Sequence, residues 1–189
     1  MAHIDLPEGL PGIIGLLTAY PHSRKPLNAL ANAVLVADAS LSRGERELIA
    51  AYTSSRNECN FCMSSHAAAA RHLLDDGARV VNGALEDAPS APLTDKMRAL
   101  LAISDLVRRD GRLVTPRDVE RARAAGADDR AIHDTVLITA MFCMFNRYVD
   151  GLGTPLPEDG ATFDVIGARI ARHGYGSQFH DEGEPAGPV

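Results

Sequence analysis

Apolar residues recur three and four positions apart along most of the chain, and the alternating apolar and polar positions that mark β-strands are almost absent. This pattern predicts an all-α fold, a bundle of helices. The expected helices cover about residues 10–20, 26–37, 43–56, 59–75, a short stretch ending near 83, and then 95–109, 116–125, 130–149 and 163–172.

Polar and glycine-containing stretches mark where these helices begin and end. Ser42 and Glu45 have the spacing of a capping box, in which the hydroxyl and the carboxylate each bind a free backbone amide. Pro26 suits the first turn of the second helix, and Thr94 suits an N-cap.

The same helix-ending stretches indicate the domain organisation. We interpret residues 86–92 as a surface loop between two helical halves of one domain, which covers residues 1–172. Residues 173–189 form a polar, glycine-rich tail, which is either disordered or held by a neighbouring subunit.

The helix at 130–149 carries apolar residues on all sides, which is typical of a helix that is central in its bundle or buried between subunits. We therefore expect a homo-oligomer. Cys143 inside this helix is interpreted as a small buried hydrophobic residue, and His133 and Asp134 as solvated groups at its start.

Charge and hydropathy restrict the possible partners. The chain has 189 residues and a formal net charge of −6, whereas nucleic-acid binding needs a basic face. The first residues lack the basic and apolar regions of a signal peptide, and the longest apolar run, 136–145, is shorter than the roughly 20 residues that span a bilayer. These features predict a soluble, cytoplasmic protein without a nucleic-acid or membrane partner.

Two cysteines and a histidine stand at the start of an alanine-rich helix. Cys59, Cys62 and His66 are spaced three and four apart, so one helix face presents all of them, and its continuation in alanine and leucine turns that face toward the interior. Three cysteines are too few for a disulfide scaffold, so the Cys-x-x-Cys pair indicates redox or metal chemistry. On the preceding helix Glu45 belongs to the capping box, which assigns Glu47 to the site.

This arrangement suits thiol chemistry. Only a thiolate attacks a peroxide or a disulfide, and a helix N-terminus or a nearby histidine favours that form. His66 can take the proton of Cys62 while Glu47 orients the imidazole, and Cys59 can then trap a sulfenic acid on Cys62 as a disulfide. The helix dipole favours Cys59 as the attacking group, but we choose Cys62 because His66 is in register with it.

Other interpretations concern the same part of the chain. A zinc site needs a fourth ligand at a suitable spacing, and the sequence offers none, so no metal is expected. Haem attachment needs a histidine directly after the second cysteine, where Met63 stands. Inert core cysteines are a further alternative. Asn146 and Arg147 either line the site or bond an adjacent chain, and the sequence does not decide between these.

A glutamate twelve residues before Cys59-x-x-Cys62-x-x-x-His66 resembles the signature of the AhpD-like alkylhydroperoxidases in the carboxymuconolactone decarboxylase superfamily. The later stretch FNRYVDGLGTPL, residues 145–156, is similar to the C-terminal helix of the peroxidase-related branch of that superfamily. The resemblance extends from about Pro26 to about Arg172, which is most of the chain.

The resemblance implies an all-helical fold assembled as trimers or hexamers, and reduction of organic hydroperoxides. It implies Cys62 as the peroxidatic cysteine and Cys59 as the resolving cysteine, with Glu47 and His66 as a proton relay. An external thiol or disulfide reductase would restore the thiols, and no cofactor is required. Better-known members carry a second histidine directly before the second cysteine, where this sequence has Phe61.

Two alternative functions stay open on the sequence alone. The first is a cofactor-free decarboxylase of the carboxymuconolactone type, in which His66 is the acid/base group and both thiols are dispensable. The second is a non-enzymatic redox sensor, in which a Cys59–Cys62 disulfide changes an oligomer or an interface.

Overall fold

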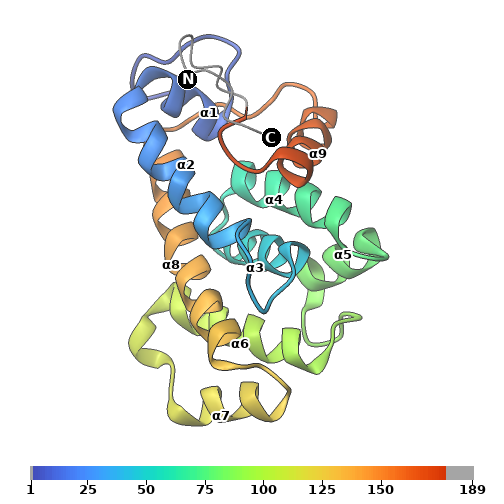
Figure 1. Ribbon diagram of the computed structural model, residues 1–189. Coiled ribbons are helices and arrows are strands. Elements are labelled where there is room, and N and C mark those ends of the chain that lie inside the picture. The colour runs from blue at the N-terminus through green and yellow to red at the C-terminus, as the bar shows by residue number, and fades with distance from the viewer. Residues whose placement is uncertain (1, 178–189) are drawn as a thin grey trace.

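The computed structural model describes residues 2–177, and that part of the chain folds into helices without a strand (Figure 1). The prediction of an all-α fold is confirmed. The helices are α1 (Gly12–Ala19), α2 (Pro21–Leu35), α3 (Arg43–Arg56), α4 (Asn60–Leu73), α5 (Gly77–Asp87), α6 (Asp95–Arg109), the short 3-10 helix η1 (Gly111–Leu113), α7 (Pro116–Ala124), α8 (Asp129–Gly151) and α9 (Ala161–His173).

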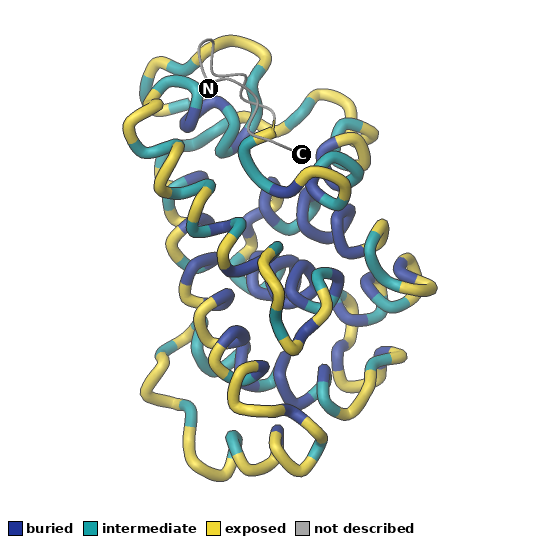
Figure 2. Tube along the Cα trace, viewed as in Figure 1, coloured by how far each residue is buried: buried dark blue, intermediate teal, exposed yellow. Residues whose placement is uncertain are grey.

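Helices α3 and α4 form the centre of the molecule and are its most completely buried pair (Figure 2). Helix α9 packs on α4, while α8 and α6 pack on the α3 side. The approach of α9 to α4 is close, because a Cβ atom on Gly167 would lie 2.4 Å from the Cβ atom of Ala68. Small residues on both helices therefore bring the cysteine-bearing helix directly under α9.

The capping box that was predicted before α3 is present. The Ser42 hydroxyl accepts a hydrogen bond from the Glu45 backbone amide, and Glu45 Oε2 accepts one from the Ser42 amide at 2.8 Å. This local motif fixes the start of the helix that carries Glu47. Thr94 likewise caps α6, its hydroxyl accepting from the Met97 amide.

Two helix boundaries differ from the prediction. Helix α2 begins at Pro21 and not at Pro26, which lies inside the helix. Pro21 already provides the fixed φ and the missing amide that suit a first turn, and the helix accommodates Pro26 with the loss of one backbone hydrogen bond. Helix α5 continues to Asp87, beyond its predicted end near residue 83, so the connection to α6 covers residues 88–94 and not the predicted 86–92.

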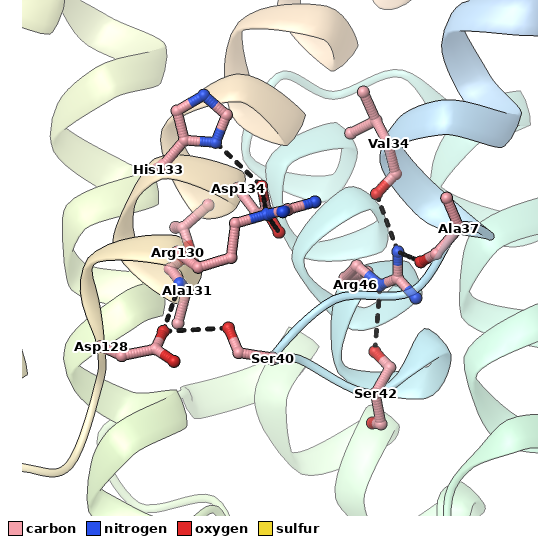
Figure 3. Close-up of polar contacts among 11 residues, drawn as sticks. Val34, Ala37, Ser40, Ser42, Arg46, Asp128, Arg130, Ala131, His133 and Asp134 are labelled. Carbon is pink, nitrogen blue, oxygen red and sulfur yellow. Dashed lines mark hydrogen bonds and ion pairs between the residues drawn. The ribbon is translucent and has the colours of Figure 1, made fainter.

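The prediction that Asp134 is solvated is wrong. Asp134 is buried, and its carboxylate lies 2.9 Å from His133 Nδ1. It also accepts hydrogen bonds from Arg130; Figure 3 shows both contacts. Buried Arg46 on α3 also interacts electrostatically with Asp134, and its guanidinium donates to the Val34 and Ala37 carbonyls at the end of α2 (Figure 3). Cations from two helices therefore compensate the buried carboxylate. His133 itself is exposed, as predicted.

Helix α8 is apolar around its circumference but is not buried on all sides. Its inner face includes Ile138 and Phe142, while Val136, Leu137 and Met144 are more than a third exposed. Cys143 is half-buried rather than fully buried, and its sulfur accepts a hydrogen bond from Asn57 at 3.5 Å. Among residues 2–177, none of the helices combines the length and the hydrophobicity needed to cross a membrane.

The described chain does not leave the domain at the end of α9. Residues 174–177 turn back over the bundle, where Asn32 on α2 binds both backbone polar groups of Tyr175. The remainder of the tail, 178–189, lies outside the described residues. Part of the segment that the sequence assigned to a polar tail therefore belongs to the domain.

Candidate active site

The structure brings together the carboxylate and the imidazole that the sequence assigned to the site. Glu47 lies in the middle of α3 and His66 in the second turn of α4, and both side chains are buried. Glu47 Oε2 lies 2.7 Å from His66 Nδ1. Because an ionised carboxylate only accepts hydrogen bonds, this contact places the ring proton on Nδ1 and leaves Nε2 as the basic nitrogen.

The second oxygen of Glu47 has its own donor, which the sequence analysis missed. The Tyr175 hydroxyl, from the segment after α9, donates to Glu47 Oε1 at 2.6 Å. The same hydroxyl lies 3.3 Å from His66 Nδ1, and the two rings stack with centroids 6.0 Å apart. Burial, followed by the neighbouring Glu47 carboxylate, raises the pKa of Tyr175 well above its usual value. The phenol therefore remains a hydrogen-bond donor at neutral pH.

The two predicted redox cysteines lie at the start of α4, both as free thiols. Cys59 is the N-cap residue rather than the first helical residue, and it is fully buried. A hydrogen bond with Cys59, followed by burial, raises the pKa of the Cys62 thiol well above its ordinary value. Cys62 therefore rests as a thiol at neutral pH and needs a base to become a nucleophile.

Asn146 on α8 is the polar neighbour of this thiol pair. It is buried, and its hydrogen bond to Cys62 acts to lower the pKa of that thiol. Its amide nitrogen donates to Ser54 Oγ at 3.0 Å, and its oxygen accepts from Asn57 Nδ2 at 2.9 Å. Of the two residues that the sequence left open, Asn146 thus lies at the candidate site, whereas Arg147 is exposed and binds the carbonyl of Cys143.

A pocket of about 60 Å³ reaches Cys62 and His66 but not Cys59. Its wall is largely apolar and comes from α1, α2, α4, α8 and the segment after α9. The lining residues are Ile13, Leu17, Leu27, Asn28, Ala31, Leu35, Phe61, Cys62, His66, Phe142, Phe145 and Tyr175.

Phe61 occupies the position before the second cysteine and forms part of this wall. Its ring packs against Phe163, with centroids 6.0 Å apart, and against the start of α1. A Cβ atom on Gly12 would lie 2.3 Å from the Phe61 ring, and Gly12 has a φ of +54°. Glycine is therefore required there both by the space that Phe61 fills and by the backbone conformation.

Comparisons with known proteins agree with this arrangement. The model of the Carboxymuconolactone decarboxylase family matches residues 21–105. The structure of an uncharacterized peroxidase-related protein from Ralstonia eutropha JMP134, titled alkylhydroperoxidase AhpD core, superposes with a TM-score of 0.74 at 28% identity, over 83% of this chain and 80% of that one. This chain is similar in sequence and fold to the AhpD-like proteins of the carboxymuconolactone decarboxylase superfamily.

Two further solved structures show the same AhpD-like fold. A peroxidase-related protein from Silicibacter sp. TM1040 has a TM-score of 0.73 at 27% identity, covering 86% of this chain and 94% of its own. A protein of unknown function from Agrobacterium tumefaciens has a TM-score of 0.65 at 25% identity, covering 78% and 99%. No curated protein matches the sequence.

The family match covers only part of the candidate site. It includes Glu47, Cys59, Cys62 and His66, and it ends before Asn146 and Tyr175. Asn146 and Tyr175 are distant in sequence from the matched residues, and tertiary packing brings them to the site. Within the part of the chain that the structure describes, no three histidine, cysteine or acidic side chains are grouped to hold a metal ion.

Proposed function

We propose that this protein is a thiol-dependent peroxidase that reduces organic hydroperoxides with Cys62 and Cys59. The observation that carries the proposal is the buried Glu47–His66 pair at 2.7 Å beside a pocket that Cys62 lines. The names of the solved relatives from Ralstonia and Silicibacter, both described as peroxidase-related, support the same reaction class.

The base is needed because Cys62 rests as a thiol. In the proposed mechanism His66 Nε2 takes the Cys62 proton, and the imidazolium that forms is stabilised by Glu47. The thiolate attacks the distal oxygen of the hydroperoxide, the O–O bond breaks, and the leaving alkoxide takes up a proton as an alcohol. Cys62 is then a sulfenic acid.

The second step uses the buried partner thiol. Cys59 attacks the sulfur of the Cys62 sulfenic acid, a disulfide forms, and water leaves. The hydrogen bond between the two cysteines supports this pairing. An external dithiol or a disulfide reductase then reduces the disulfide and returns both thiols, which suits a reducing cytoplasm.

The pocket wall supports an organic substrate over hydrogen peroxide. Phe61, Phe142 and Phe145 line it together with aliphatic side chains, so an alkyl or aryl group gains contacts that a hydroxyl group does not. We therefore expect cumene hydroperoxide to be consumed faster than hydrogen peroxide.

The test is hydroperoxide consumption by the purified protein with dithiothreitol as reductant. Cys62→Ser should abolish turnover, and Cys59→Ser should start normally and then decay as Cys62 over-oxidises. Cys143→Ser is the matched control, because this third thiol lies outside the pocket, and it should retain full activity.

Absence of turnover above background in the unmutated protein would refute the peroxidase. A reversible Cys59–Cys62 disulfide without turnover would then favour a redox sensor. Decarboxylase activity that survives alkylation of both cysteines would favour the lactone decarboxylase.

We also propose that the protein assembles as a homo-oligomer through α8. Val136, Leu137 and Met144 form an exposed apolar stripe on this helix, which is unfavourable for an isolated chain in water. Light scattering should give a mass above 20.2 kDa for the unmutated protein and a lower mass for Leu137→Glu. An unmutated protein of monomeric mass would refute the assembly.

A further inference from the structure

Tyr175 is held over the candidate site by a backbone clamp. Asn32 Nδ2 donates to the Tyr175 carbonyl at 2.8 Å, and the Tyr175 amide donates to Asn32 Oδ1 at 2.9 Å. The Asn32 side-chain amide therefore satisfies both backbone polar groups of Tyr175, as the backbone of a neighbouring β-strand does in a sheet. The clamp joins α2 to the segment after α9, two parts of the chain that are 143 residues apart.

Glycines on both sides allow the segment to adopt this path. Gly174 has a φ of +70° and Gly176 a φ of +96°, which are conformations that other residues rarely take. A Cβ atom on Gly174 would also lie 2.8 Å from Asn32 Oδ1, so the clamp itself excludes a side chain there. The two glycines of the Gly-Tyr-Gly sequence thus allow the backbone path that places Tyr175 beside Glu47.

We propose that Tyr175 is a positioning residue of the site, which holds Glu47 through its hydroxyl and closes the pocket with its ring. The kinetic consequences of this role rest on the proposed function. The effect of Tyr175 on the protonation of His66 does not depend on peroxidase activity.

The Tyr175 hydroxyl acts on His66 by its hydrogen bond to Glu47. The carboxylate is fully buried and has two donors in the described structure, His66 Nδ1 on one oxygen and the Tyr175 hydroxyl on the other. A hydrogen bond to a carboxylate lowers its basicity. Without the Tyr175 donor, Glu47 becomes a stronger acceptor for His66, and the imidazolium becomes more favourable. Tyr175 therefore keeps His66 neutral, and able to act as a base, at lower pH than the carboxylate alone would allow.

Charged and titratable groups from the neighbouring elements act on the same cluster. Arg43 on α3 favours the ionised form of Tyr175, whereas Cys62 on α4 disfavours it. Asp150 on α8 acts on Cys62 and raises the pKa of that thiol. None of these groups donates to Glu47, so Tyr175→Phe removes a donor that they do not replace.

The first experiment follows the His66 imidazole by NMR as a function of pH. Its resonances are identified by their loss in His66→Gln, since the chain has 7 histidines. Tyr175→Phe keeps the ring and removes the hydroxyl. The His66 titration midpoint should then move upward, by less than the roughly one pH unit expected for a hydrogen bond made directly to the titrating group, because Tyr175 acts on His66 through Glu47. Tyr148→Phe is the matched control, because Tyr148 does not line the pocket, and it should leave the midpoint unchanged.

The second experiment measures hydroperoxide turnover against pH. In Tyr175→Phe the acidic limb of kcat/KM should move upward with the His66 midpoint, and activity at alkaline pH should approach that of the unmutated protein. Tyr175→Ala also removes the wall of the pocket, so KM for an organic hydroperoxide should increase as well. Asn32→Ala releases the clamp and should shift the His66 midpoint in the same direction as Tyr175→Phe.

The outcomes separate the two proposals. An unchanged His66 midpoint in folded Tyr175→Phe would overturn the positioning role, even for an active peroxidase. A shifted midpoint in a protein without turnover would support the role of Tyr175 and refute the peroxidase. Circular dichroism of Tyr175→Phe establishes that the variant is folded.

Discussion

His66 Nδ1 lies 2.7 Å from Glu47 Oε2 in the interior of the protein, where neither side chain has appreciable contact with water. A hydrogen bond between these groups fixes the tautomer and the orientation of the imidazole, as carboxylate–histidine pairs do in many enzymes. The same contact makes Glu47 the residue whose charge most directly sets the basicity of His66.

Glu47→Gln should therefore lower hydroperoxide turnover by up to about a hundredfold, because Glu47 orients His66 and a general base that loses its position loses most of its usual contribution. The amide has nearly the same shape, so the variant should fold. Glu45→Gln is the matched control on the same helix, because Glu45 serves the capping box and a 2.9 Å ion pair with Lys96. It should retain turnover and lose at most about 0.5 kcal/mol of stability in urea denaturation, because glutamine also completes a capping box and only the ion pair is lost. Equal turnover in the two variants would contradict the assignment of Glu47.

Cys59→Ala should lower the pKa of Cys62, because it removes the hydrogen bond with Cys59, which is the largest cause of that elevation, with burial the next. The rate of iodoacetamide alkylation at Cys62, followed against pH in a Cys143→Ser background, should then rise at lower pH than in the parent. Asn146→Ala should move the same curve the opposite way, since Asn146 lowers this pKa. A common shift in one direction for both variants would show that the assignment of causes is wrong.

The free energy of unfolding should fall at alkaline pH. Cys62 and Tyr175 both have pKa values raised above their ordinary values of 9.0 and 10.0, so the unfolded chain releases these protons first. Their contribution is fully present below about pH 9 and is lost as the pH rises through the folded-state values. Urea denaturation between about pH 8 and pH 10.5 should show a shallower decline for Tyr175→Phe than for Tyr148→Phe. Identical declines would indicate that Tyr175 titrates as in the unfolded chain.

Gly167→Ala should destabilise the fold by about 1 to 3 kcal/mol, because the added methyl would meet the Ala68 backbone carbon at 2.6 Å and the Ala69 nitrogen at 2.7 Å. Backbone atoms cannot turn aside, so α9 must move away from α4. Gly151→Ala, at the end of α8, is the control: a Cβ atom there has nothing within 4 Å, and alanine should cost nothing. Equal midpoints of urea denaturation for the two variants would argue against close packing of α9 on α4.

Local features of the sequence predicted much of the fold and the centre of the site. The capping box at Ser42 and Glu45 acts within four residues, and the row of Cys59, Cys62 and His66 depends only on helical spacing. Glu45 forms the predicted capping box while Glu47 contacts His66, because residues two apart face different directions on a helix.

Features that depend on tertiary packing were not predictable in this way. Asp134 was expected in water, and it is buried where α8 packs against α3, with Arg46 of α3 acting on it electrostatically. Tyr175 was placed in a tail, and only its clamp by Asn32 brings it to Glu47. Its flanking glycines were a visible signal of an unusual backbone, but nothing near them in the sequence identified the partner.

The hydrogen bond between Tyr175 and Glu47 determines when the site is completed during translation. The two residues are 128 positions apart, so a nascent chain exposes both cysteines, His66 and Glu47 to the cell well before the ribosome has released Tyr175. Until then the pocket lacks one wall and Glu47 lacks one donor. The two thiols therefore exist for a period without their complete surroundings, and the site is complete only after α9 and the turn that follows it have been made.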